Sequence, residues 1–195
     1  MKTMLILILS FLSLQLNAQQ NLYSGIKSGC SPREFQKAIM LNPDFKSGYD
    51  SLSESQDYGD YITTVINERQ FVVTPVYNSE DKLESLMFIS ANSYGSDDVE
   101  MRIQAFELCE TYSLKSSVVL KVNPISDLYL QQLKNGSIKP VCVIKTSGVN
   151  THIFVVKIAG RYRNMMVIND SRFNDILPST DSKNICETQA RNYLK

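Results

Sequence analysis

The sequence contains a single histidine, His152, no block of like charge, and no long apolar segment beyond residue 18. With 20 basic and 20 acidic residues evenly spread, it lacks the basic patch of a nucleic-acid-binding protein, so no nucleic-acid partner is expected. No membrane span is expected once the amino-terminal segment is removed. One histidine without clustered partners makes a poor metal site, and no metal or other cofactor is expected.

Cysteines are few and widely spaced: Cys30, Cys109, Cys142 and Cys186. This spacing argues against a zinc site, which favours short C-x-x-C pairs. In an exported protein the four thiols allow three complete pairings, and the sequence does not select one. A bridge from Cys30 to Cys186 and a bridge from Cys109 to Cys142 both remain open.

Residues 1–18, "MKTMLILILSFLSLQLNA", have the pattern of a secretory signal. Lys2 lies near the start, an apolar run of about ten residues follows, and Ala18 ends the segment as the small residue of a cleavage site. The rest, residues 19–195, is long enough for one domain with a hydrophobic core. We therefore expect a single secreted or periplasmic domain with no lipid anchor, since no cysteine follows the expected cleavage site.

Local signals place the first elements. Residues 19–29 read as an irregular lead-in, and the segment after Cys30 reads as a helix. In that helix Ser31 and Glu34 form a capping box and Pro32 occupies the first helical position. Residues 43–58 are rich in Ser, Asp and Gly and predict an irregular connector.

A helix is also predicted after Ser96, with an apolar stripe facing the core. The stripe consists of Val99, Ile103, Phe106, Cys109 and Tyr112. Two further helices are predicted, one after Pro124 and ended by Gly136, the other in "NICETQARNYL" near the carboxyl terminus.

Runs of β-branched and aromatic residues predict strands, and Pro75 within one of them indicates an edge strand or a bulge. These runs are "DYITTVIN", "FVVTPVY", "KLESLMFISA", "SSVVLKV", "KPVCVIKT" and the hairpin "THIFVVKIAGRYRNMMVIND". Strands grouped with strands, together with three to four helices, predict an α+β domain with a mostly antiparallel sheet.

The predicted hairpin contains three of the four candidate catalytic residues. Pairing about its turn could bring Asn169 or Asp170 close to His152, where an amide or carboxylate would fix the tautomer of the ring. Such a histidine can activate a thiol, and Cys30 is the best candidate because a helix start lowers a thiol pKa.

The order of these residues resembles the papain-like cysteine peptidases, and within them the bacteriocin-processing (double-glycine) peptidases and their relatives. The matching pieces are Cys30 and, within residues 136–171, "NGSIKPVCVI", "HIFVV" and "VINDS". The resemblance implies a papain-like fold, with Cys30 as nucleophile, His152 as base and Asp170 as the residue that orients it. Asn169 is the alternative orienting residue.

Other interpretations remain open for each of these residues. His152 could hydrogen-bond locally at a strand end. Cys30 could form a disulfide or pack on Phe35 as a hydrophobic staple, and Asp170 could cap a turn through backbone amides two residues on.

Three functions therefore remain open at this point. The first is an exported thiol hydrolase that cleaves a peptide or amide bond, with peptidoglycan as one substrate suggested by location. The second is a non-catalytic envelope module that binds or inhibits a protein or peptide through a sheet edge. The third is a structural exported domain whose cysteines form disulfides.

Overall fold

The computed structural model describes residues 19–47, 62–95, 99–114 and 118–172. The expected signal, most of the polar connector, Cys186 and the expected last helix lie outside the described residues. Within them the chain is an α+β domain with three helices and a mostly antiparallel sheet, as predicted.

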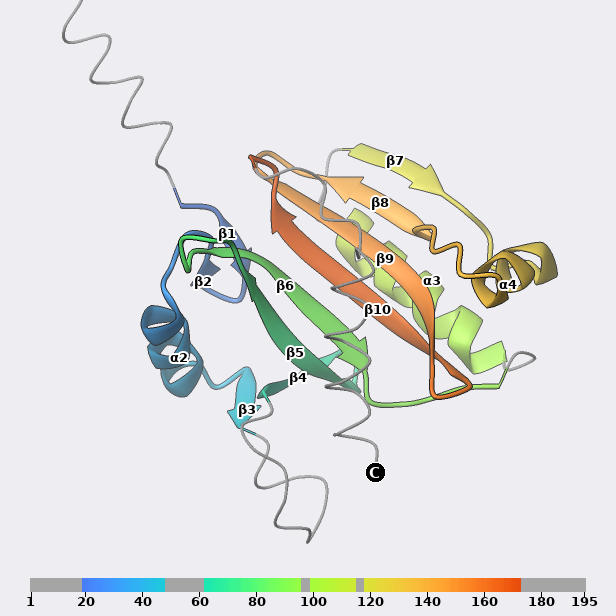
Figure 1. The fold of residues 1–195 in the computed structure, drawn as a ribbon, viewed down its shortest axis with the longest axis horizontal. Helices are drawn as coiled ribbons and strands as arrows, with labels where there is room; N and C mark the ends of the chain where they lie inside the picture. Colours follow the sequence, from blue (N-terminus) through green and yellow to red (C-terminus); the bar gives the residue numbers. More distant parts are fainter. Residues whose placement is uncertain (1–18, 48–61, 96–98, 115–117, 173–195) are drawn as a thin grey trace, which may run out of the picture.

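The strands are β1 (Asn21–Tyr23), β2 (Ile26–Lys27), β3 (Phe45–Ser47), β4 (Ile62–Ile66), β5 (Arg69–Tyr77), β6 (Leu83–Ser90), β7 (Val118–Val122), β8 (Cys142–Lys145), β9 (Val149–Ile158) and β10 (Arg161–Asp170). The helices are α2 (Pro32–Leu41), α3 (Val99–Ser113) and α4 (Asp127–Lys134). Strands β1 and β2 form a hairpin of their own, and the other eight form one sheet in the order β3-β4-β5-β6-β10-β9-β8-β7 (Figure 1).

The two longest strands, β9 and β10, form a hairpin in the interior of the sheet. Its two turn residues, Ala159 and Gly160, have positive φ angles of 50° and 82°, the geometry that suits a two-residue hairpin turn. The pairing runs without a break from Ile158 opposite Arg161 to Val149 opposite Asp170. On its other side β10 pairs antiparallel with β6, which joins the two halves of the sheet.

Side chains alternate along β9 and β10 between two buried clusters, one on each face of the sheet. The larger cluster includes Ile153, Val155, Met166 and Ile168, and it continues into the hairpin β1–β2 and the helices. The second includes Met87, Phe154, Val156, Met165 and Val167. We call these the helix face and the second face.

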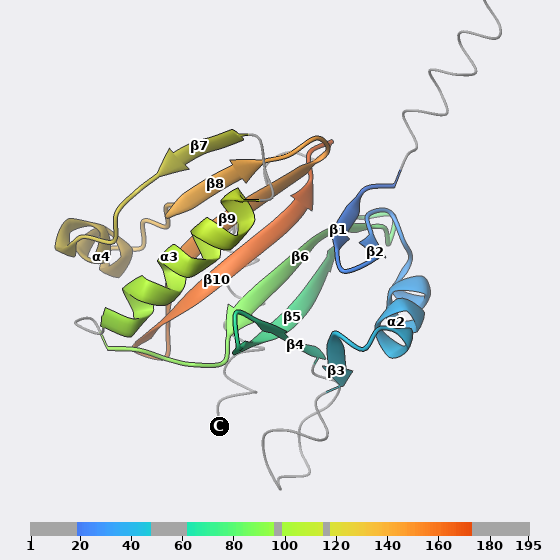
Figure 2. The ribbon, with the colours of Figure 1, turned by 180° about the vertical axis from the view of Figure 1, so that it is seen from behind.

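Helix α3 lies on the helix face, across β8, β9 and β10 (Figure 2). The predicted stripe packs on the core at Cys109 and Tyr112, but it is wrong for its other three residues: Val99 is 65% exposed, Ile103 is 42% exposed and Phe106 is 66% exposed. The buried residues are Met101, Gln104, Ala105, Leu108 and Cys109.

A polar contact sets the rotation of this helix. Asn164 of β10 donates a 2.6 Å hydrogen bond to the side-chain oxygen of Gln104, and the Gln104 amide donates to Ser90 at 3.2 Å. Apolar residues occur on several sides of α3, so hydrophobic spacing alone cannot identify the side that packs on the sheet.

Two segments predicted to be irregular contain short strands. Within residues 19–29, β1 and β2 pair through a turn in which Ser24 and Gly25 have φ angles of 44° and 83°. Within the connector, Phe45–Ser47 forms β3 and pairs with β4, because Phe45 is buried in the core.

Pro75 was predicted on an edge strand or at a bulge, and β5 lies between β4 and β6. The described pairing of β4 ends opposite Val73, so Pro75 lies on a stretch that pairs with β6. Pro75 itself pairs in regular register with Leu86, and the register shift comes after Val76, between Val76 and Tyr77. The structure therefore places an irregularity close to Pro75 but not at it, and among the described residues Pro75 has a strand partner on one side only.

The helix-start predictions are confirmed at α2, where Ser31 and Glu34 make both bonds of the capping box and Pro32 begins the helix. In α4 the helix itself was predicted, and its first turn is capped by Ser126, which accepts a 3.2 Å hydrogen bond from the Tyr129 amide.

Candidate functional site

The structure does not bring the predicted nucleophile to the predicted base. Cys30 precedes α2 and belongs to the cluster on the helix face. Its carbonyl accepts a 2.9 Å hydrogen bond from the amide of Leu83, at the start of β6. Burial, followed by the nearby carboxylate of Glu34, raises the pKa of its thiol, opposite to the lowering expected of an activated cysteine. Cys30 instead has the location of the staple residue, in the same core as Phe35.

His152 points to the second face. It lies opposite Val167 in β10, and its ring centroid is 6.1 Å from that of Phe154. Both of those neighbours belong to the second cluster, and β10 lies between His152 on β9 and the β6 strand beside Cys30. The thiol and the imidazole are therefore on opposite faces of the sheet.

Asp170 does not orient the imidazole. Its carboxylate is fully buried and accepts hydrogen bonds from the Ser28 hydroxyl at 2.6 Å and from the Arg172 guanidinium at 2.6 and 3.0 Å. The Arg172 amide donates to it at 2.9 Å, which confirms the alternative interpretation of a turn-capping aspartate. Burial would raise the pKa of this carboxyl, but the hydrogen bonds from Arg172 and Ser28 together lower it.

The side chain of Asn169 points to the other face of the sheet from that of Asp170. Asn169 pairs with Asn150, two residues along each strand from the pair of His152 and Val167. Asn169 is therefore on the second face, together with His152. Its side chain is fully buried and donates a 3.3 Å hydrogen bond to the Asp170 carbonyl. Of the two candidate orienting residues, only Asn169 shares a face with the histidine.

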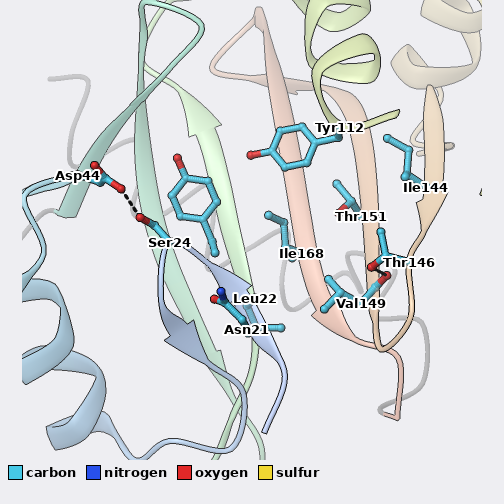
Figure 3. A pocket seen from close by; sticks show the side chains of 11 residues that line it. Asn21, Leu22, Ser24, Asp44, Tyr112, Ile144, Thr146, Val149, Thr151 and Ile168 are labelled. Atoms are coloured by element: carbon cyan, nitrogen blue, oxygen red, sulfur yellow. Dashed lines mark hydrogen bonds between the residues drawn. The ribbon is translucent and has the colours of Figure 1, made fainter. Parts of the chain in front are cut away.

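A cavity of about 380 Å³ opens on the helix face, between the hairpin β1–β2 and the last turn of α3 (Figure 3). Its floor is one cross-strand row of the sheet, Ile144, Thr151 and Ile168. The other lining residues are Asn21, Leu22, Tyr23, Ser24, Asp44, Tyr112, Thr146 and Val149. Its volume is within the range of small-molecule sites.

Two tyrosines supply phenol groups to this cavity. Figure 3 shows Tyr112 extending from α3 with its hydroxyl directed toward the β1 side. Tyr23, on β1, is fixed by ring contacts with Phe45 and Phe88, at centroid distances of 5.8 and 4.9 Å. Burial raises the pKa of both phenols, and that of Tyr112 is raised further by the nearby Tyr23. Both groups are therefore protonated, neutral hydrogen-bonding groups at physiological pH.

Among the described residues that line the cavity, Asp44 is the one that carries a charge. The turn after α2 positions it, because the Asp44 amide donates a 2.9 Å hydrogen bond to the side chain of Asn42. The Ser24 hydroxyl in turn donates to the Asp44 carboxylate. A neighbouring hollow of about 410 Å³ shares Tyr23 and Asp44 and extends along β4.

No signal in the sequence indicated this cavity. Its residues come from five separate segments, with no spacing pattern among them. They meet because β1 packs against β6 and β10 while α3 ends over the same rows of the sheet.

Comparisons of the chain with protein-family models, curated proteins and solved structures found no match. The peptidase resemblance therefore stays a prediction. In the described part of the chain, no helix has the length and apolar character needed to cross a bilayer. Among the same residues no three His, Cys, Asp or Glu side chains cluster as metal ligands would.

Proposed function

We propose that this chain is an exported, non-catalytic binding domain whose cavity receives a small polar ligand carrying a protonated amine. The thiol hydrolase is not our proposal, because the Cys30 thiol and the His152 ring face opposite sides of the sheet. Export rests on the signal-like pattern of residues 1–18 alone.

The observation that carries the proposal is the charge pattern of the cavity. In the part of the chain that the structure describes, the cavity lining combines one carboxylate, that of Asp44, with the hydroxyls of tyrosine, threonine and serine residues. A carboxylate forms charge-assisted hydrogen bonds with an ammonium group, and tyrosine ring faces attract cations. Neutral phenols and Thr151 can bind hydroxyl or carbonyl groups of the same ligand, so amino sugars and amino-acid derivatives with a blocked carboxylate fit this chemistry.

Isothermal titration calorimetry tests the proposal with matched pairs of compounds. Glucosamine is compared with glucose and N-acetylglucosamine, and lysine methyl ester with its Nα,Nε-diacetylated form. We expect binding by the free amines and at least tenfold weaker binding by the neutral partners, because these cannot form the charge-assisted bond.

Variants then connect binding to the cavity. Asp44→Asn should weaken amine binding at least tenfold, and Tyr112→Phe should weaken it several-fold. Glu80→Gln is the matched control, since Glu80 is exposed in the turn before β6 and does not line the cavity. Equal binding by wild type and Asp44→Asn, or no binding of any amine, would contradict the proposal.

A further inference from the structure

Two cysteines from distant parts of the chain meet beneath α3. Cys109, in the last half of this helix, and Cys142, the first residue of β8, lie in the buried cluster where α3 packs on β8, and each thiol perturbs the pKa of the other. Both belong to the cluster on the helix face, where Cys109 is 8% exposed and Cys142 is fully buried. Both are free thiols, as is Cys30.

We propose that Cys109 and Cys142 are a disulfide-forming pair that links α3 covalently to β8. Because α3 packs on β8 and both side chains are buried in the same cluster, side-chain rotation can bring the two sulfurs to bonding distance. An exported protein reaches a compartment in which such a bond persists. The proposal concerns the cross-link alone and holds whether or not the cavity binds a ligand.

The chemistry is exchange with a small disulfide donor such as oxidised glutathione. One of the two cysteines attacks a donor sulfur as its thiolate, the donor S–S bond breaks, and one donor thiolate leaves. The other cysteine then loses its proton and attacks the protein sulfur of this mixed disulfide, which releases the second donor thiolate. Two protein thiols are oxidised to one disulfide, and one donor disulfide is reduced to two thiols.

Because both sulfurs are buried in the folded domain, the donor reaches them before α3 has packed on the sheet, so exchange accompanies folding.

The cross-link would join two elements, α3 and β8, that each supply a residue to the lining of the cavity. Tyr112 lies one turn after Cys109 on α3, and Ile144 lies two residues after Cys142 on β8. Both line the cavity. A bond between the two cysteines therefore fixes the distance between two walls that are otherwise held by packing.

The test uses the whole chain. Reduced, denatured protein is refolded with oxidised glutathione, residual thiols are alkylated, and proteolytic peptides are identified by mass spectrometry. We expect a peptide that links Cys109 to Cys142, also in the Cys30→Ser variant, which serves as the matched control. Native reduced protein exposed to the same donor should form the link at least tenfold more slowly.

Stability provides a second readout. The oxidised protein should melt about 10 °C above the same protein after reduction, from the loop-closure entropy of a 33-residue loop, and amides at 109–114 should exchange more slowly. Alkylated Cys109 and Cys142 in the refolded protein, or a link from either one to Cys30 or Cys186, would overturn the proposal.

Discussion

The hydroxyl of Ser28 donates a 2.6 Å hydrogen bond to the carboxylate of Asp170, from 142 positions away in the sequence. Ser28 also accepts a 3.0 Å hydrogen bond from the amide of Gln20, and both Ser28 and Asp170 are fully buried. This contact fastens the amino-terminal hairpin to the end of β10. The hairpin in turn forms one wall of the cavity.

Replacing Asp170 by Asn should therefore destabilise the domain. Asparagine keeps the size of the side chain but removes the charge that binds Arg172 and an acceptor oxygen that binds Ser28 or Arg172. We expect the free energy of unfolding to fall by about 2–3 kcal/mol, measured by urea denaturation at pH 7. Asp81→Asn, at an exposed turn position, is the control and should change it by less than about 0.5 kcal/mol. A neutral effect of Asp170→Asn would show that the contact does not stabilise the fold.

The same carboxyl predicts an acid-sensitive fold. Its pKa is lower in the folded state, so its contribution is fully present above the unfolded value of about 3.9 and is lost as the pH falls through the folded value. Urea midpoints measured from pH 6 to pH 2 should fall most steeply below about pH 4. This decline should be shallower in Asp170→Asn, and parallel profiles would contradict the assignment.

The turn between β8 and β9 needs a glycine at position 148. Gly148 has a φ of +97°, and an added Cβ would lie 2.3 Å from the side-chain oxygen of Gln20. Gly160 has a similar φ of +82° with no atom within 4 Å. Alanine at either position should cost about 1–2 kcal/mol for the left-handed backbone.

Gly148→Ala should cost more than Gly160→Ala, because Gln20 must also move. In a Gln20→Ala background the two substitutions should cost the same amount, which a double-mutant cycle in urea measures. If Gln20→Ala leaves the difference unchanged, the close approach does not account for it.

The rotation of α3 can be tested by two alanine substitutions. Leu108 is 1% exposed and Phe106 is 66% exposed, although hydrophobic spacing had placed Phe106 on the buried stripe. Leu108→Ala should cost about 2–5 kcal/mol, whereas Phe106→Ala should cost less than about 0.5 kcal/mol. Thermal unfolding followed by circular dichroism would show the reverse order if the helix packed on the predicted side.

The elements that the sequence predicted well are those with local causes. The capping box of Ser31 and Glu34 and the alternation along β9 need only neighbouring residues to form. The buried side of α3 was missed because Gln104 selects it by bonding Asn164, 60 positions away. Such a polar contact between distant segments leaves no periodic signal.

The structure does not bring the predicted triad together, and the register of the hairpin, which can be read from the sequence, explains why Asp170 is not beside His152. The turn at Ala159 and Gly160 fixes the register, which places His152 opposite Val167. Asp170 is three residues from Val167 and therefore faces the other side of the strand. Counting residues from the turn would have left Asn169 as the one candidate on the face of His152. The cavity around Tyr23 and Asp44 could not be found in this way, since it depends on how separate segments pack.

The position of β10 in the sheet affects how the protein is made. It is the last of the described strands to be synthesised, yet it pairs with both β6 and β9. A nascent chain that lacks β10 can hold β3–β6 and β7–β9 only as two separate groups of strands. Completion of the eight-stranded sheet must therefore wait until β10 has been synthesised, late in translation.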